Sequence, residues 1–582
     1  MRLLKLFALA HATAVALECH TEPILPRPQN LVQSESFQNS LSGLTEKLDA
    51  AIAGEIKAGW DTRNVSMSIG LLSYNQPDPS VPIWEYHHLA SGNVNGTKKV
   101  NRDSQYLIGS VSKVITDAIL LRSGIDLDAP ITSFIPALDN DTSIIHWKNI
   151  TLRSLAGQLA GIPTNYGFSE YYYLNFYFEL LGFPTLPNTS YPPCGVFGLN
   201  KGCTKDQYLT GLLHSHPTAD PSTRPVYSNV AFALAIYALS SVTNKTYTEL
   251  LSPLPMHSTF PAPGNDSLAV IPPVPNNWGS SYGDDAPGGG LVSTLSDLSV
   301  FFHAILSRDP KLGLSETQIR EWLKPHAFTG SPYSFVGMPW EIFRPAPGLV
   351  FPDYNATTGE GGHIVTIYQK GGGAYGYRSH VALVEEYGLG LVVLTAGGQN
   401  ALEIVTSAVL GVVLPAADEA AREEVERQYV GVWEANGDAI NATVEVDGVG
   451  LKLAGLWRDG SDILEGLREL WDVTVNAFLP SRLNKLFRLY PASVERKAQV
   501  EGREVVLEDW RFQWDMEFDT ASDLPGERLA GNDCLSWTLG DWMHYGSEPV
   551  DRVVFVKDAQ TGKVLWLDVP FLRTGMMEKA AV

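Results

Sequence analysis

The sequence predicts an α/β domain built on an antiparallel sheet, followed by a second domain of antiparallel strands. In the first 415 residues, strand-like runs gather near both ends of the segment and are joined by short connections, which favours antiparallel pairing. From Tyr429 onward, short alternating runs recur between turn signals. The chain of 582 residues, 44% hydrophobic and 18% charged, is long and apolar enough for two or more packed domains.

The elements of the first domain follow from their hydrophobic spacing. Helical spacing begins in "LSGLTEKLDAAIAGEIKAGW", and the alternating runs "VSMSIGLLSY" and "IWEYHHLASG" predict neighbouring strands. Further helices are predicted at "SVSKVITDAILL", at "YSNVAFALAIYALSSVT", from near Ser296 in "GGGLVSTLSDLSVFFHAIL" and at "ALEIVTSAVLGVVLP". Three consecutive strands are predicted at "HIVTIYQKGGG", "RSHVALVEEYG" and "GLVVLTAGG". Helices therefore flank a sheet whose strands come from both ends of the domain.

Changes in composition set the predicted boundaries. A signal peptide over residues 1–16 and a Pro-rich lead over 17–37 precede the main domain at 38–415. A charged, Ala-rich helical linker is expected at 416–428, and a β-rich, barrel-like domain at 429–582.

The N-terminus indicates secretion. Arg2 and Lys5 precede the apolar run "LFALAHATAVAL", and small residues at 14–16 offer a cleavage site. A membrane anchor is the alternative, but this run is too short to span a bilayer, and no membrane span is expected elsewhere. Nine Asn-x-Ser/Thr sequons, more than chance predicts, agree with a secreted glycoprotein. They lie at Asn64, Asn95, Asn140, Asn149, Asn188, Asn244, Asn265, Asn355 and Asn441.

The four cysteines fit an oxidising compartment. Cys194 and Cys203 would close a short loop, and Cys19 with Cys534 would tie the N-terminus to the C-terminal region; free thiols are the alternative. The net charge of −22 argues against nucleic-acid partners. The sequence does not indicate an oligomeric state.

A candidate nucleophile stands at the head of the helix after Tyr106. In "YLIGSVSK", Ser110 and Lys113 are three positions apart, so they share one helix face. A lysine whose pKa is lowered by burial can take the proton of a serine hydroxyl. An isolated Ser-x-x-Lys match is more often an ordinary capped helix with a solvated lysine.

Two further elements supply partners for such a nucleophile. "VYSNVAF" places the phenol of Tyr227 and the amide of Asn229 at the start of another helix. "YQKGGG" places Lys370 before Gly371, Gly372 and Gly373 at the end of a strand, where glycines let a substrate approach closely. Taken singly, Tyr227 could be a core aromatic and the glycines a tight turn.

Together, in this order and at these separations, the three motifs resemble the serine β-lactamases and penicillin-binding proteins, most closely their class C and esterase branch. "DSQYLIGSVSK" and "IDLDAPITSFIPAL" also look like recurring segments of that family. The resemblance covers roughly residues 40–415. It implies a β-lactamase/transpeptidase-like fold, with an antiparallel sheet flanked by helices and a helical subdomain.

The resemblance also implies roles for the motif residues. Ser110 would be acylated, with Lys113 and Tyr227 handling its proton and the backbone N–H groups of Ser110 and Gly373 forming the oxyanion hole. Substrate binding would fall to Asn229, Lys370, Gly371 and Gly372. Gly371 stands where the family usually has a threonine that helps to bind a substrate carboxylate, so recognition of penicillin-like acids is in doubt.

These observations predict a secreted serine hydrolase that acts through an acyl-enzyme on ester or amide bonds of a small-molecule or short-peptide acyl substrate. A β-lactam or D-amino-peptide hydrolase is the alternative within the class. A catalytically inactive binding protein on the same fold is the alternative from another class. Residues 164–226, long and aromatic, could form a lid over an apolar substrate or simply pack as a variable loop.

No cofactor or metal is expected. His214 and His216 lie two apart in "LLHSHP", but no Asp follows at metal-ligand spacing, so we expect a loop pair. The sequence contains no Gly-x-Ser-x-Gly elbow, which argues against a Ser-His-Asp hydrolase.

Overall fold

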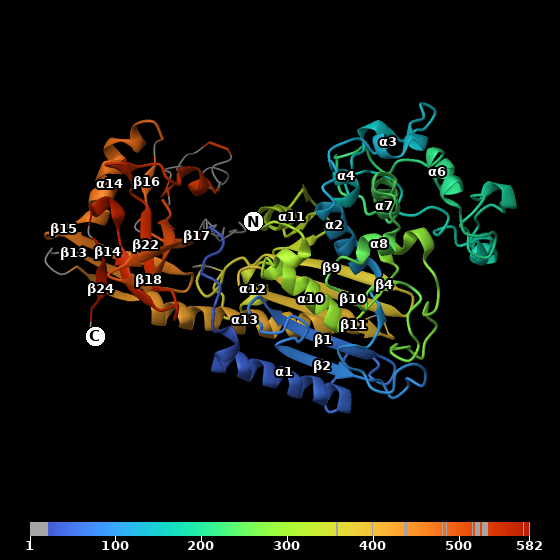
Figure 1. The fold of residues 1–582 in the computed structure, drawn as a ribbon, viewed down its shortest axis with the longest axis horizontal. Coiled ribbons are helices and arrows are strands. Elements are labelled where there is room, and N and C mark those ends of the chain that lie inside the picture. The colour runs from blue at the N-terminus through green and yellow to red at the C-terminus, as the bar shows by residue number, and fades with distance from the viewer. Residues whose placement is uncertain are drawn as a thin grey trace, which may run out of the picture. The chain divides into compact units, whose positions relative to one another are not determined.

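The structure is a computed structural model that divides into two compact units (Figure 1). The first contains Asn39–Pro345 and Val365–Val413. The second contains the chain up to Gln38, Ala346–Ile364 and everything from Leu414 onward. The structure describes residues 21–356, 359–398, 400–435, 440–479, 481–484, 486–514, 516–517, 524–525, 534–573 and 575–580.

An eight-stranded antiparallel sheet forms the centre of the first unit. Its central strands β1 (Ser66–Ser73) and β11 (Leu389–Ala396) pair along their full length and are buried at every position, because helices cover both faces. The strand order is β2 (Trp84–His88), β1, β11, β10 (Tyr377–Val384), β9 (Ile367–Ala374), β8 (Glu341–Phe343), β7 (Ser334–Val336) and β6 (Ala327–Phe328).

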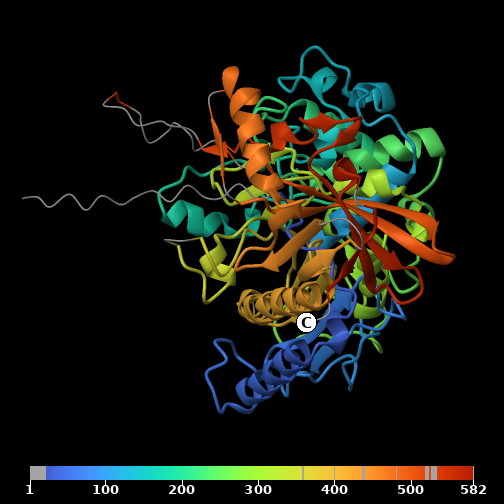
Figure 2. The same ribbon diagram turned by 90° about the vertical axis from the view of Figure 1, so that its left-hand side faces the viewer.

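Two helices cover opposite faces of this sheet (Figures 1 and 2). On one face lies α10 (Leu295–Leu306). Its Leu295 packs so closely on Gly70 of β1 that a Cβ at Gly70 would clash with it. On the other face lies α1 (Glu35–Ala53), where Asp49 accepts a hydrogen bond from Tyr86 of β2. Ile69 pairs with Tyr86, so Tyr86 and Gly70 face opposite ways. The predicted helix–sheet layering is confirmed.

A helical subdomain is inserted between the first and last strands of the sheet. Its central helix α7 (Val230–Thr243) is buried along most of its length, as expected of a helix that is apolar all round. The same part of the chain contributes a small sheet of β3 (Tyr106–Leu107), β5 (Leu291–Ser293) and β4 (Phe260–Pro261). The other helices are α2 (Ser112–Arg122), α3 (Ile131–Phe134), α4 (Leu152–Ala156), α5 (Asn175–Leu180), α6 (Lys205–Leu213), α8 (Tyr247–Leu251), α9 (Ala286–Gly289) and α11 (Glu316–Trp322).

The second unit is built on a nine-stranded antiparallel sheet, as predicted from its alternating runs. A bridge between Lys452 and Arg488 brings β14 beside the start of β17, so the sheet curves back on itself. The order is β15 (Ser461–Asp462), β14 (Leu451–Arg458), β13 (Ile440–Val446), β12 (Gly431–Glu434), β24 (Met577–Lys579), β23 (Val564–Asp568), β22 (Arg552–Asp558), β18 (Arg503–Phe512) and β17 (Leu489–Val500).

Shorter elements complete this unit, and one of them was not predicted. The helix α14 (Ile463–Val473) buries Leu464, Leu467 and Trp471 along one side, a helical spacing that was visible in the sequence. Also present are α12 (Pro347–Val350), a two-stranded sheet of β16 (Arg482–Leu483) and β19 (Met516–Glu517), and a short hairpin of β20 (His544–Tyr545) and β21 (Glu548–Pro549).

The division between the units differs from the predicted boundaries. Residues 416–428, expected as a separate linker, are the second half of one continuous helix α13 (Ala401–Tyr429), which runs through Pro415. The two units divide within this helix, at Leu414. By length and mean hydropathy α13 could cross a membrane, a span not expected from the sequence, yet 56% of its most apolar stretch is buried.

Several predicted surface features can be located. Cys194 and Cys203 form the expected disulfide. Cys534 is also disulfide-bonded, while its predicted partner Cys19 and the predicted signal peptide lie outside the described residues. Of the nine sequon asparagines, Asn64 and Asn441 are half-buried and the other seven are exposed.

The cap of α14 gives a test of the second unit. The Asp462 carboxylate accepts a hydrogen bond from the Glu465 N–H at 3.1 Å, so Asp462→Ala should lower the free energy of unfolding by about 1 kcal/mol. Asp472→Ala is the matched control, because this exposed carboxylate lies near the helix C-terminus, where it gains nothing from the dipole. Calorimetric unfolding of the full chain would measure both; equal losses would contradict the capping role.

Candidate active site

Ser110 lies in a tight turn that only glycine can precede. The turn Gly109–Val111 connects β3 to α2, and Gly109 has φ +51°, in the left-handed region. A Cβ on Gly109 would lie 2.4 Å from the backbone nitrogen of Gly373. The close approach of these two backbones therefore sets the position of Ser110 relative to strand β9.

Lys113 is the second residue of α2 and is completely buried. Its Nζ is 3.0 Å from Ser110 Oγ and 2.6 Å from Asn229 Oδ1, and it also donates to the carbonyl oxygen of Gly288. The amide and carbonyl oxygens can only accept. A neutral amine with its two N–H groups directed to those oxygens would therefore turn its lone pair toward the Ser110 hydroxyl.

Burial is the main electrostatic influence on this amine. It lowers the pKa of Lys113 well below the ordinary lysine value, and the positive charge of Lys370 lowers this pKa further. The carboxylates of Glu341, Asp117 and Asp285 act in the opposite direction. Ser110 thus has beside it an amine that gives up its proton more readily than an ordinary lysine.

Tyr227 contacts the other side of the nucleophile. Its hydroxyl donates to Ser110 Oγ at 2.6 Å, and its ring lies 4.8 Å from Lys113 Nζ and 5.2 Å from Lys370 Nζ. The side chain is 39% exposed, so it lines an open site and is not a core aromatic. The phenol, the serine and the lysine form one hydrogen-bonded cluster, as the predicted roles require.

The loop that carries Tyr227 and Asn229 is held by Thr164 and Asn165. Thr164 Oγ1 donates to the Tyr227 carbonyl at 2.9 Å, and the Asn229 N–H donates to the Thr164 carbonyl at 2.8 Å. The Asn229 side-chain amide donates to Asn165 Oδ1 at 2.7 Å. Asn229 is therefore fixed between Lys113 and Asn165, with its oxygen turned to the lysine.

Strand β9 brings the glycine run against the nucleophile turn. A Cβ on Gly372 would lie 2.2 Å from the Ile108 carbonyl oxygen, 2.3 Å from Ser379 Oγ and 3.1 Å from the Ser110 nitrogen. Ser379 of β10 donates to the same Ile108 oxygen at 2.6 Å. Gly373 is exposed beside this turn, which places the Ser110 and Gly373 backbones together, as an oxyanion hole requires.

The Lys370 ammonium is hydrogen-bonded to a carboxylate that the sequence did not single out, and not to Ser110 or Lys113. Lys370 Nζ lies 2.5 Å from Glu341 Oε1, and the Gly371 N–H donates to Glu341 Oε2 at 3.0 Å. Lys370 is buried, while Glu341 is 43% exposed in its side chain. Nothing in the local sequence around Glu341 marks it, because its pairing depends on the alignment of β8 with β9.

Asp117 is a second site residue that sequence reasoning missed. It lies one turn beyond Lys113 on α2, is fully buried, and its carboxyl oxygens have no hydrogen-bond partner within the described part of the chain. Burial raises the pKa of Asp117 well above the usual range. A lone acidic residue in the apolar helix "VITDAILL" was a signal that could have found it.

The aromatic segment that follows Asn165 is exposed. The positions from Tyr171 to Ser190 are exposed or half-buried, including Phe176, which is 70% exposed, and Leu180, which is 77% exposed. These side chains do not pack into the core of the first unit. Exposed apolar clusters of this kind usually mark a binding surface.

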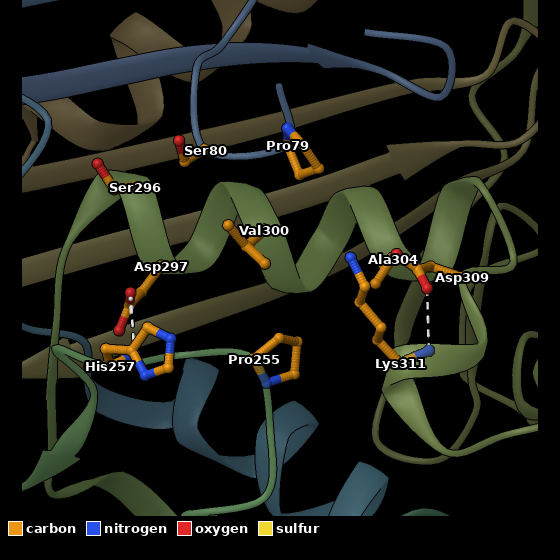
Figure 3. Close-up of a pocket in the computed structure, with 10 residues that line it drawn as sticks. All are labelled: Pro79, Ser80, Pro255, His257, Ser296, Asp297, Val300, Ala304, Asp309 and Lys311. Carbon is orange, nitrogen blue, oxygen red and sulfur yellow. Dashed lines mark hydrogen bonds between the residues drawn. The ribbon is translucent and has the colours of Figure 1, made fainter. Parts of the chain in front are cut away.

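A separate hollow of about 260 Å³ lies along α10 (Figure 3). None of its lining residues belongs to the Ser110 cluster. The Asp297 carboxylate, which faces His257 there, accepts hydrogen bonds from the backbone N–H groups of His257 and Ser258. These hydrogen bonds hold the loop that contains His257 and Ser258.

Within the described residues, no group of three or more His, Cys, Asp or Glu side chains could hold a metal ion.

Comparison with known proteins agrees with this geometry. Residues 83–408, more than half of the chain, match the family model described as "Beta-lactamase". The chain belongs to the β-lactamase family. Residues 421–580 match a model described as a β-lactamase-like C-terminal domain. The predicted family and fold are thus confirmed.

Individual relatives extend the comparison over both units. A "Beta-lactamase-like protein" of Arthroderma benhamiae is 42% identical over 579 residues, covering 96% of this chain and 95% of that protein. "Probable hydrolase M10" of a Phoma species is 27% identical over 512 residues, covering 83% and 80% respectively. Among solved structures, a penicillin-binding protein homologue from Pyrococcus abyssi has 16% identity and a TM-score of 0.44, covering 82% of this chain and 98% of that one.

The close contacts at Gly372 give a first test of the site. In Gly372→Ala the new methyl group would push β9 away from Ile108 and Ser379, so hydrolysis of an activated ester should fall by about 100-fold. Gly371→Ala is the comparison, because a Cβ there has one neighbour, Glu341 Oε2, at 3.6 Å. It should lose much less. Similar losses in the two variants would contradict the importance of this close approach.

The lowered pKa of Lys113 gives a second test. If neutral Lys113 accepts the serine proton, kcat/KM should rise with pH through the Lys113 pKa and reach its plateau well below the ordinary lysine value of about 10.4. At lower pH the amine is protonated and cannot accept. Lys113→Arg, which stays charged, should remove this limb from the pH profile. A limb near the ordinary lysine value would show that burial does not tune this amine.

Proposed function

We propose that this protein is a secreted serine hydrolase that forms an acyl-enzyme on Ser110 and acts on ester or amide bonds. One observation carries the proposal. Ser110 Oγ is within hydrogen-bond distance of both Lys113 Nζ, at 3.0 Å, and the Tyr227 hydroxyl, at 2.6 Å. A serine needs such a base to attack a carbonyl carbon, and a second proton carrier to release the leaving group.

In the proposed reaction, Ser110 Oγ attacks the substrate carbonyl while its proton passes to Lys113, directly or through Tyr227. The tetrahedral oxyanion is held by the backbone N–H groups of Ser110 and Gly373. When the oxyanion collapses, the bond to the leaving alcohol or amine breaks, and that group takes the proton. Water then attacks the ester on Ser110, which releases the acid; an alcohol in place of water would give acyl transfer.

The exposed aromatic segment, Tyr171 to Ser190, is a candidate for contact with the acyl group of the substrate. It continues directly from Asn165, whose side chain contacts Asn229 in the site. We propose that these aromatic and aliphatic side chains contact an apolar acyl group, as a lid would. Secretion is supported by the N-terminal sequence and by the exposure of seven sequon asparagines.

The proposal is tested by mass spectrometry of the intact protein with a fluorophosphonate probe and a panel of esters, thioesters, β-lactams and D-amino peptides. We expect one adduct per chain on Ser110, absent from Ser110→Ala. Ser112→Ala is the matched control in the same peptide, because the Ser112 hydroxyl is hydrogen-bonded to the Gly109 carbonyl. That variant should keep the adduct.

Tyr227→Phe separates the chemistry from the fold. Loss of the phenol should reduce turnover of the same ester by about 100-fold or more, with the thermal stability nearly unchanged, because Tyr227 is partly exposed. A well-folded wild type that acquires no adduct from any reagent would favour the alternative, a non-catalytic binding protein. Full turnover in Tyr227→Phe would remove Tyr227 from the proton path.

A further inference from the structure

A carboxylate of the protein itself, that of Glu341, binds to Lys370 and to the first glycine after it, Gly371. Glu341 Oε1 lies 2.5 Å from Lys370 Nζ, and Glu341 Oε2 accepts the Gly371 N–H at 3.0 Å. Lys370 Nζ also donates to the Gly371 carbonyl at 2.8 Å, so two of the three ammonium hydrogens are engaged. A single carboxylate thus takes both the charge and the backbone donor at this position.

The position of Glu341 is fixed by strand pairing. It lies on β8 directly opposite Gln369 of β9, one residue before Lys370. The pairing of β8 with β9 stops at Gln369, and Gly371, Gly372 and Gly373 continue alongside the nucleophile turn. Glu341 is therefore the first residue of β8, at the end of that strand nearest the site.

The second cation near the glycine run is also paired. Arg378 of β10 lies opposite Gly373, and its Cδ would be 3.7 Å from a Cβ at that glycine. Its guanidinium forms an ion pair with Glu403 of α13. The remaining amine of the site, Lys113, is completely buried behind Ser110. Lys370 and Arg378, the two cations beside the glycine run, thus each have a carboxylate partner.

A substrate carboxylate at this place would have to displace Glu341 or lie against it. Two carboxylates in close contact repel each other, and the displaced Glu341 would lose a charged hydrogen bond to Lys370. Gly371 offers no hydroxyl as an alternative donor. A neutral ester or amide meets none of these costs, and it still finds the backbone donors next to Ser110.

We propose that Glu341 is a specificity-determining residue that restricts the site to acyl substrates without a carboxylate near the scissile bond. The inference rests on the proposed acyl-enzyme function of Ser110. It names neutral esters and amides as the substrate class. It places β-lactam acids and peptides ending in a free D-amino acid among the poor substrates.

The test uses two aryl acetates that differ in one group, a meta carboxylate in one and a meta carboxamide in the other. The full-length wild type should hydrolyse the neutral ester with a kcat/KM about tenfold or more above that of the anionic ester. In Glu341→Gln, which keeps the size of the side chain, this preference should shrink by about tenfold through faster turnover of the anionic ester. Glu316→Gln, an exposed carboxylate on α11, is the control and should leave both rates unchanged.

Three outcomes separate the possibilities. A wild type that takes both esters equally overturns the inference, as does a Glu341→Gln variant in which both rates change by the same factor. Fluorophosphonate labelling of Ser110 at the wild-type rate shows that the variant is folded and that its nucleophile works. If the wild type itself acquires no label, the proposed function fails, whatever the two esters show.

Discussion

The site depends on the burial of one amine. Lys113 is removed from water by the packing of α2 against α7 and α9, and its Nζ contacts three oxygens, those of Ser110, Asn229 and Gly288. These contacts can hold a charged ammonium, which then donates to all three. They also suit the neutral amine that burial favours, because two oxygens take its N–H groups and the third position belongs to the serine. Proton exchange with Ser110 therefore needs no movement of the lysine.

The buried carboxyl of Asp117 is compatible with a neutral Lys113, because burial disfavours the charged form of this carboxyl too. Ionised, it would hold a proton on Lys113 and oppose the effect of burial. Burial raises the pKa of Asp117 well above the usual carboxyl range, so the neutral acid is favoured. Burial therefore lowers the pKa of Lys113 and raises that of Asp117, and both shifts favour the uncharged form.

The sequence predicted the parts of the site that are carried by local motifs. Ser110 and Lys113 are three positions apart, so helix geometry alone brings them together. The motif of Tyr227 and Asn229 could be assigned to the same site because the family resemblance places it beside the Ser110 motif. Glu341 could not be predicted, since its contact with Lys370 depends on the register between β8 and β9, a long-range property.

The same distinction holds for the fold. Strands β1, β2, β9, β10 and β11 were recognised because alternation and apolar runs are local signals. The short strand β24 and the division of the chain within α13 were not, because β24 pairs with the remote strand β12 and the division depends on packing between distant segments. Ala346–Ile364, predicted inside the main domain, belongs to the second unit for the same reason: its partners are remote in sequence.

The Lys370–Glu341 ion pair takes part in both the proposed substrate preference and the proposed proton transfer. The positive charge of Lys370 lowers the pKa of Lys113, whereas the negative charge of Glu341 raises it. The carboxylate that occupies Lys370 therefore also offsets the influence of Lys370 on the buried amine. An anionic substrate that displaced Glu341 would bring its own charge into the same place, while a neutral one leaves the pair intact. A neutral ester would therefore bind next to the amine without changing the charges of the Lys370–Glu341 pair.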